Sequence, residues 1–255
     1  MLTLTPEHIT PALRDLFPSD QPAQLRFDGV LNGAFPGRLL TDDPDRPSWG
    51  VLQENVYGTI YLGGRFDADR LEEIVRLLRQ DTAELLFGYW DAQHPLADLF
   101  PDPLYRGAVY DCTERAADTP LAFDLTVPAG LQLRPFDEEL LRQSADYDFH
   151  ISLYGSEAET LANGVGFALL NEHGIVSEAF AGLRVGNLIE VGVTTRPSHR
   201  GKGYATCVSA HLVLECERRG LQTYWNCNAQ NTASLSIART LGYQRQRIYN
   251  LYGWF

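Results

Sequence analysis

Apolar residues recur at strand-like and helix-like intervals through the second half of the chain. The alternation in Leu131–Pro135 predicts a strand, and the acidic residues that follow Asp137 are typical of a first helical turn. Two apolar runs, 164–170 and 175–183, are joined by a turn-forming tetrapeptide, and a third run, Leu188–Thr195, follows a second short turn. These three runs predict a three-stranded meander.

A long amphipathic helix is predicted directly after the meander. From about Gly203 to Arg219 the apolar residues fall on one stripe at helical spacing, namely Ala205, Val208, Leu212 and Cys216. Gly220 stands where a glycine commonly ends a helix. The residues beyond it predict a short strand at Thr223–Cys227, a second helix at Asn231–Leu241 and a returning strand at 245–255.

This order of strands and helices predicts an α/β layer architecture for the second half. The first half is less regular, but Ser48–Leu62 predicts paired strands and Asp67–Leu78 an amphipathic helix. We therefore predict a small α/β domain at residues 1–122 and a second domain at 129–255. The proline-containing segment 114–128 is the natural boundary between them.

Composition narrows the class of protein. The chain is 44% apolar and 21% charged, as expected of a globular protein, and its net charge of −12 argues against nucleic acid as a partner. The negative charge favours a cationic substrate only weakly, because it also serves solubility. No apolar run approaches about 18 residues and no signal peptide is evident, so we expect no membrane association and a cytoplasmic protein.

Cysteine and histidine spacing gives no sign of a metal site. The four cysteines, Cys112, Cys207, Cys216 and Cys227, form no Cys-x-x-Cys pair, and the six histidines are scattered. We expect reduced thiols and no bound metal.

A glycine-rich turn lies between the third meander strand and the long helix. Its sequence, His-Arg-Gly-Lys-Gly-Tyr-Ala at His199–Ala205, is neither a Walker loop nor a Rossmann fingerprint. Glycines let a backbone approach a ligand closely, and the first N–H groups of a helix are unpaired donors that attract an anion. The arrangement suits phosphate binding, although turn geometry alone also explains two glycines.

The residue pattern of this turn is more specific than its two glycines alone. Arg200-x-x-Gly203-x-Ala205 resembles the Arg/Gln-x-x-Gly-x-Gly/Ala signature of the GNAT superfamily, the acyl-CoA-dependent N-acetyltransferases. A second block at residues 225–243, with Asn-x-x-Ser and a closing Leu-Gly-Tyr, resembles the family's late strand and helix. The resemblance covers roughly residues 129–255 and points to a subgroup with an extra N-terminal half, which would be a degenerate GNAT-like copy.

The resemblance implies a mixed, mostly antiparallel sheet flanked by helices, with acetyl-CoA as the cofactor. The loop amides would hold the coenzyme A pyrophosphate, and the third meander strand would splay from its neighbour to pair with the pantetheine amides. The implied cofactor-binding residues are Val193, Thr194, Thr195, Arg200, Gly201, Lys202, Gly203, Tyr204, Ala205, Thr206, Asn231 and Ser234. Asn231 is equally well placed to be the N-cap of its own helix.

Glu190 is the candidate catalytic residue. It lies inside an apolar strand, and burial raises the pKa of a carboxyl group, which suits a general base for an ammonium substrate. The alternatives are an arginine partner or a position facing solvent.

The function implied is transfer of an acetyl group from acetyl-CoA directly to a small-molecule amine, by a monomer or a homodimer. One position departs from the family pattern, because Ala238 stands where many members carry a tyrosine proposed to protonate the leaving thiolate. A non-catalytic acyl-CoA-binding sensor is therefore the alternative function. A scaffold whose N-terminal half binds a partner is a third possibility.

Overall fold

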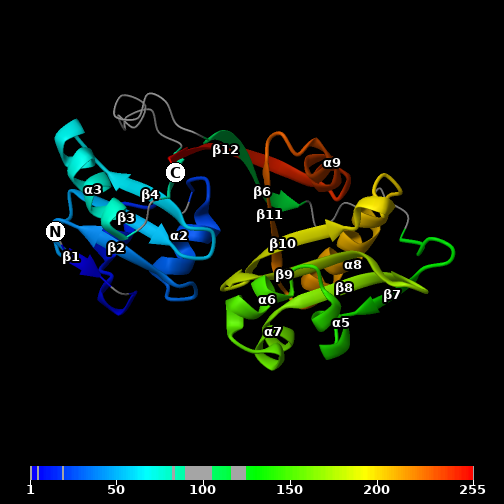
Figure 1. Cartoon of the computed structure of the whole chain (residues 1–255). Coiled ribbons are helices and arrows are strands. Elements are labelled where there is room, and N and C mark those ends of the chain that lie inside the picture. Colours follow the sequence, from blue (N-terminus) through cyan, green and yellow to red (C-terminus); the bar gives the residue numbers. More distant parts are fainter. Residues whose placement is uncertain are drawn as a thin grey trace. The chain divides into compact units, whose positions relative to one another are not determined.

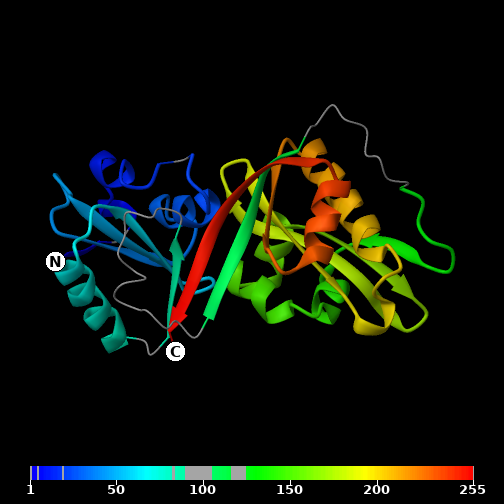
Figure 2. The ribbon, with the colours of Figure 1, turned by 90° about the horizontal axis from the view of Figure 1, so that it is seen from above.

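The computed structural model describes residues 2–4, 6–18, 20–81, 84–89, 105–115 and 125–254. These residues form two compact units (Figure 1, Figure 2). The first unit contains residues 1–110, 228–230 and 248–255, and the second contains residues 111–227 and 231–247. The predicted boundary between residues 122 and 129 lies partly outside the described residues and stays a prediction.

The first unit is built on a sheet with the strand order β1-β2-β3-β4-β5-β12. Its strands are β1 (Leu2–Leu4), β2 (Gly37–Thr41), β3 (Trp49–Glu54), β4 (Thr59–Gly64), β5 (Leu85–Tyr89) and the end of β12 (Tyr243–Trp254). The β4–β5 pair is parallel and the other neighbours of known register are antiparallel. Its helices are a 3-10 turn (Pro6–His8), α1 (Pro11–Arg14), α2 (Gln24–Leu31) and α3 (Ala68–Asp81).

One hydrophobic core of the first unit lies between α3 and the sheet. Leu71, Ile74 and Leu78 recur at helical spacing and are buried with residues of β3 and β4, such as Val51 and Ile60. The predicted paired strands and the predicted helix are thus confirmed as β3, β4 and α3. The shorter elements β1, β2, β5 and α2 were not predicted, because none carries a long periodic pattern.

The second unit has the strand order β12-β6-β11-β10-β9-β8-β7. Its strands are β6 (Tyr105–Arg115, from Asp111 on), β7 (Gln132–Pro135), β8 (Val165–Asn171), β9 (Gly174–Val185), β10 (Leu188–Thr195), β11 (Gln222–Asn228) and the beginning of β12. Its helices are α5 (Glu138–Gln143), α6 (Tyr147–Tyr154), α7 (Glu157–Asn163), a 3-10 turn (Pro197–His199), α8 (Tyr204–Arg218) and α9 (Thr232–Thr240). The α/β fold with a mostly antiparallel sheet and flanking helices is as predicted.

Helix α8 closes one face of this sheet. Val208, Leu212 and Cys216 are fully buried, and α8 contacts β8, β9 and β10. Gly203 at the N-cap and Gly220 after the last turn both have a positive φ, which glycine adopts without strain. The predicted helix is therefore confirmed to within a residue at each end.

Helices α6 and α7 were missed by the sequence analysis. Both are short, and α6 is apolar around much of its circumference, so its helical period is weak. A usable signal was present for α7, because Ser156 and Glu159 form the Ser-x-x-Glu pattern of a capping box. Ser156 Oγ indeed accepts a hydrogen bond from the Glu159 amide at 3.2 Å. None of the described helices combines the length and the apolar character that crossing a membrane requires.

Candidate functional site

Strands β10 and β11 separate partway along their length. They pair in parallel only at three positions, from Leu188 opposite Gln222 to Glu190 opposite Tyr224, although both strands continue beyond. On its other side β10 stays paired with β9 as far as Thr195, after an irregularity in register near Glu190. The backbone of residues 191–195 therefore has one edge without a ladder partner, as the family resemblance implied.

The side chains of this open segment are held by neighbouring elements. Thr194 donates to Asp146 Oδ2 at 2.9 Å, and the hydroxyl of Thr195 lies 2.8 Å from that of Ser177. Val193, like both threonines, is half-buried. Because both threonine hydroxyls already have hydrogen-bond partners, the open main chain of residues 193–195 is free to pair with a ligand.

The glycine-rich loop follows this segment at once. Gly201 and Gly203 have φ of +74° and +79°, and a Cβ at either position would meet no atom within 4 Å. The backbone amides from Gly201 to Thr206 donate to no acceptor in the described part of the chain, and the first helical bond runs from Cys207 N to Gly203 O at 3.0 Å. The loop is thus a row of open N–H donors at the positive end of a helix.

Basic side chains surround these amides. Arg200 Nε donates to the Thr195 carbonyl at 3.2 Å, which ties the loop to the end of β10. Lys202 is exposed, and its ammonium lies 5.9 Å from the centroid of the Tyr204 ring. Arg196 is also exposed. The charge and the donors together suit a phosphate or pyrophosphate group.

Asn231 and Ser234 begin helix α9 and have internal roles. The Asn231 side chain accepts from the Ser234 amide at 3.1 Å, so the N-cap role is confirmed. The Ser234 hydroxyl accepts from the buried Trp225 indole at 3.1 Å. Asn231 is exposed, so its amide group remains open to a second contact.

Ala238 stands where the family pattern leads us to expect a tyrosine. Ala238 is completely buried. The nearby Tyr243 is 3% exposed; its hydroxyl donates to Thr223 Oγ1 at 2.6 Å, and burial raises its pKa. Burial also raises the pKa of the Cys227 thiol. Tyr243 and Cys227 are thus core residues, whereas Tyr204 is half-buried at the start of α8.

Glu190 lies at the last paired position before the two strands separate. It is half-buried, and its ladder partner Tyr224 donates from its hydroxyl to Asp111, a completely buried carboxylate. Asp111 also accepts from Asn226 Nδ2 at 2.7 Å and pairs with Arg247 at 3.4 Å. This network fixes β11 beside Glu190. Sequence reasoning missed it, because Asp111 and Arg247 come from strands remote in the chain.

A second buried acid, Glu178 on β9, was also missed. It is 3% exposed, and desolvation by burial is the main cause that raises its pKa. The signal that singled out Glu190, a lone acid inside an apolar strand, applies to Glu178 as well.

Metal-ligating groups do not converge in the part of the chain that the structure describes. No set of three or more histidine, cysteine, aspartate or glutamate side chains there could hold a metal ion. All four cysteines are buried, and none of them is part of a disulfide.

Known proteins share this architecture. A family model described as GNAT acetyltransferase matches residues 20–252. YdfB, an uncharacterised N-acetyltransferase of Bacillus subtilis strain 168, is 26% identical over 238 residues, which are 88% of this chain and 87% of that protein.

Two solved structures show the same fold. A GCN5-related N-acetyltransferase-like protein from Streptococcus suis 89/1591 gives a TM-score of 0.72 at 22% identity, over 95% of this chain and 97% of that one. A tandem GNAT protein from the clavulanic acid biosynthesis pathway gives a TM-score of 0.59 at 14% identity, over 97% and 92%. These likenesses give no support to the non-catalytic sensor. The chain belongs to the GNAT acetyltransferase family and is an acyltransferase.

Proposed function

We propose that the second unit transfers an acetyl group from acetyl-CoA to the nitrogen of a small-molecule amine. The observation that carries this proposal is the separation of β10 from β11 at Glu190, directly before a loop of open backbone amides. The continuous segment from Glu190 to Thr206 thus contains, in chain order, a candidate base, an unpaired strand edge and an anion site.

The residues present fit acetyl-CoA. The amides of Gly201–Thr206, with Arg200 and Lys202, would hold the pyrophosphate, and the open edge of Val193–Thr195 would pair with the pantetheine amides. Asn231 and Ser234 would border the arm at the start of α9. Acetyl-CoA supplies a thioester, whose acyl group is activated for attack by an amine.

Glu190 is proposed to take the proton from the acceptor ammonium, directly or through water. Glu190 is the last residue of β10 that pairs with β11, so its backbone adjoins the open edge of the strand. A positioned base contributes roughly 10²–10⁴-fold to such a reaction. Water is the proton source we favour for the leaving thiolate, because Tyr243 and Cys227 are enclosed in the core.

In this proposal the first unit is a degenerate copy that has lost the cofactor site. Both units have four antiparallel strands in sequence, then a helix, then a strand parallel to the fourth. At the start of α3, however, Asp67 Oδ1 accepts from the Arg70 amide at 2.8 Å. A carboxylate at the helix N-terminus would repel a phosphate, so we place acetyl-CoA in the second unit alone.

The test combines calorimetric binding of acetyl-CoA with thiol release measured against a panel of amines. Glu190→Gln should leave acetyl-CoA affinity near that of the wild type and lower turnover by about 10²-fold. The rate of the wild type should rise with pH through the pKa of the base, and the variant should lose that dependence.

Glu172→Gln is the matched control, because Glu172 is a highly exposed acid in the β8–β9 turn of the same sheet. It should behave as the wild type. The proposal fails if no amine accelerates thiol release although acetyl-CoA binds. The role of Glu190 fails if its variant loses binding and stability together while turnover follows the folded fraction.

A further inference from the structure

One carboxylate oxygen of Glu178 is buried without a donor. Its Oε1 accepts two hydrogen bonds, from the Ser144 hydroxyl at 3.0 Å and from the Ala145 amide at 2.8 Å. Oε2 is buried as well, but no donor in the described part of the chain reaches it. Leaving a buried carboxylate oxygen without a donor is costly, so a donor from outside the chain is expected there.

Glu178 faces a small pocket beside the open segment of β10. The pocket has a volume of about 20 Å³, which admits one water molecule or one ammonium group, and Gln143, Ala145, Thr194 and Arg196 are among its lining residues. Thr194 is the ladder partner of Glu178 and donates to Asp146. Arg196 is near enough to favour the charged form of Glu178 but does not hydrogen-bond to its buried Oε2. Glu178 in the pocket and Asp146 next to it, opposed by the one guanidinium of Arg196, make the charge of this region negative.

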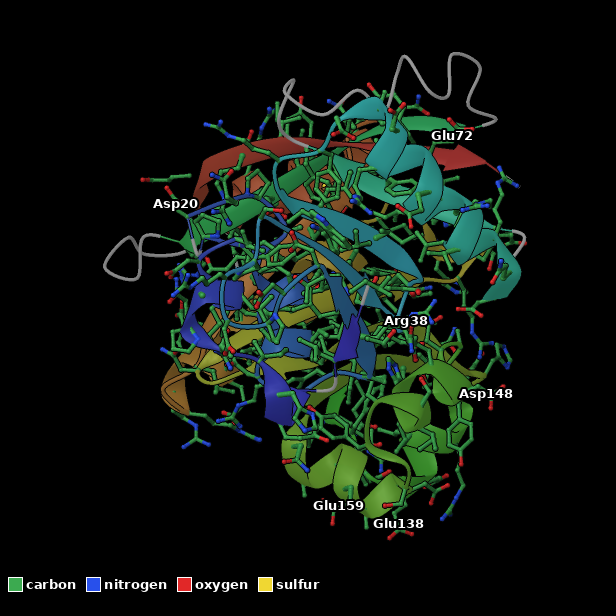
Figure 3. The ribbon with its side chains drawn as sticks, turned by 90° about the vertical axis from the view of Figure 1, so that its left-hand side faces the viewer. Asp20, Arg38, Glu72, Glu138, Asp148 and Glu159 are labelled. Atoms are coloured by element: carbon green, nitrogen blue, oxygen red, sulfur yellow. The ribbon has the colours of Figure 1, made fainter. Side chains whose placement is uncertain are left out.

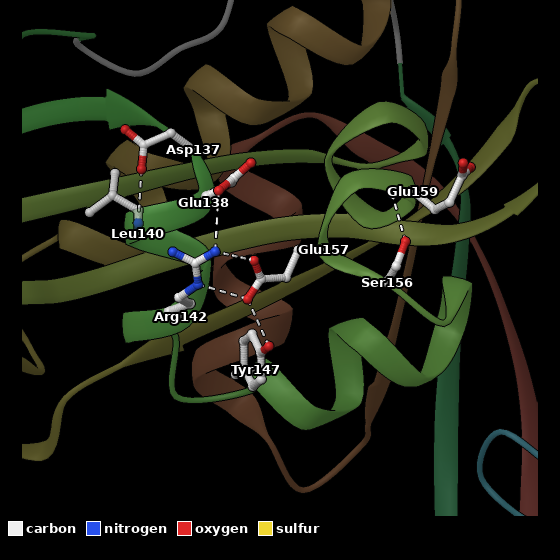
Figure 4. A network of polar contacts seen from close by, with 8 residues as sticks. All are labelled: Asp137, Glu138, Leu140, Arg142, Tyr147, Ser156, Glu157 and Glu159. Atoms are coloured by element: carbon white, nitrogen blue, oxygen red, sulfur yellow. Dashed lines mark hydrogen bonds and ion pairs between the residues drawn. The ribbon is translucent and has the colours of Figure 1, made fainter.

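The wall of this pocket is held in place by helices α5, α6 and α7. Arg142 at the end of α5 donates to Glu157 at 2.8 Å, and the Tyr147 hydroxyl of α6 donates to the same carboxylate at 2.8 Å (Figure 4). These bonds anchor both ends of the loop that carries Ser144 and Ala145. The pocket is therefore pre-formed and does not depend on a ligand to order it.

We infer that this pocket binds the second ammonium group of a diamine acceptor, with Glu178 Oε2 as the hydrogen-bond acceptor. This inference rests on the proposed function, because it names the class of amine that Glu190 would deprotonate. An ammonium supplies both the missing donor and the charge that balances the pocket. Water supplies only the donor.

The distance along β10 suits a linear diamine. Thr194 and Glu190 are four residues apart, or at most roughly 13 Å of extended strand, and the lengths of the two glutamate side chains can shorten that span. Nearby helices add negative charge, because Glu138, Asp148 and Glu159 point outward from α5, α6 and α7 (Figure 3), although Glu138 is paired with Arg142 at 3.2 Å. Burial raises the pKa of Glu178, so a proton competes for Oε2 and diamine binding should weaken on acidification.

The experiment compares linear diamines of four to eight carbons with monoamines of equal length. Thiol release gives kcat and KM for each, and calorimetry gives diamine binding without catalysis. In the wild type, kcat/KM should be at least tenfold higher for the best diamine than for its monoamine. Glu178→Gln should remove this advantage by raising KM for the diamine, and should leave monoamine kinetics and acetyl-CoA affinity unchanged.

Glu172→Gln serves as the charge-matched control and should keep the preference for diamines, because its side chain is exposed. If Glu178→Gln does not fold, Asp146→Asn carries the test. Asp146 is exposed, and its loss should reduce the ratio of diamine to monoamine kcat/KM severalfold without a change in circular dichroism.

The outcomes separate this inference from the proposed function. Turnover of monoamines with no preference for diamines would overturn the subsite and leave the acetyltransferase proposal standing. Calorimetric diamine binding that disappears in Glu178→Gln, without thiol release from any amine, would support the subsite and overturn the proposed reaction. Equal diamine binding in the wild type and in Glu178→Gln would mean that the pocket holds only water.

Discussion

Ser234 shows how one side chain can be needed for the fold and be a candidate for the cofactor site. Its hydroxyl accepts the hydrogen bond of the Trp225 indole N–H, and Trp225 is 1% exposed. Removal of that hydroxyl would leave a buried donor without a partner. The fold therefore constrains this position whether or not it touches acetyl-CoA.

We expect Ser234→Ala to lower the free energy of unfolding by about 1–3 kcal/mol, the usual cost of an orphaned buried donor. Chemical denaturation measures this. Ser236→Ala in the same helix is the control and should change stability by less than about 0.5 kcal/mol, because Ser236 is exposed. Equal stability of the two variants would show that water replaces the lost acceptor.

At the scale of single residues, the sequence predicts those positions whose role follows from the residues next to them in the chain. Glu190, Asn231 and Gly203 all lie in local patterns of a strand, a helix start and a turn. Asp111 could not be found in that way, because its partners Tyr224, Asn226 and Arg247 are brought to it by strand pairing. The predicted roles of Glu190 and of the loop in chemistry and binding stay predictions.

At the scale of elements, the segment formed by β10, the glycine-rich loop and α8 combines a strand edge with a helix N-terminus. The second half was predictable here because long runs of one period lead from each strand to the next helix. The first half was less so, since short elements such as β5 gain their stability from partners distant in sequence. β5 pairs with β12, whose register no local pattern can give.

Gly203→Val should weaken acetyl-CoA binding at least tenfold, or about 1.4 kcal/mol, because a branched side chain projects among the open amides. Gly186→Val is a matched control. Gly186 also has a positive φ, +60°, and a Cβ there would meet no atom within 4 Å, but it lies in the β9–β10 turn. Both variants should therefore carry a similar backbone strain, but only Gly203→Val should lose affinity for acetyl-CoA.

A chemical footprint adds a second measurement. Lys202 is the chain's single lysine, so amine-reactive reagents should modify it and the α-amino group alone. Coenzyme A should slow the labelling of Lys202 in the wild type and in Gly186→Val, but not in Gly203→Val. Equal protection in all three proteins would place the pyrophosphate elsewhere.

At the scale of the whole molecule, buried titratable groups set the response to acid. His150 is 6% exposed between aromatic rings, the nearest being Phe180 at 4.2 Å between centroids. Burial lowers its pKa from 6.5 to about 4. The folded state thus keeps the imidazole neutral over a range in which the unfolded chain takes up a proton.

The free energy of unfolding should therefore fall as the pH drops from 6.5 to about 4, and His150 should contribute about 3 kcal/mol to this fall. Glu178 acts in the opposite direction, because its raised pKa makes the folded state bind a proton more readily as the pH falls. His150→Phe should flatten the acid limb of stability, measured by denaturation at several pH values. An unchanged slope would assign acid sensitivity to other groups.

The pairing of β5 with β12 has a consequence for the order in which the protein is made. Tyr89 pairs with Asn250, and Leu85 with Trp254, so the sheet of the first unit gains this edge only after the second unit has been translated. Until then β5 presents unpaired backbone groups, which invite pairing with another chain. The interval between the synthesis of positions 89 and 250 is the period in which a nascent chain is most exposed to misassembly, and truncation before residue 250 would make that exposure permanent.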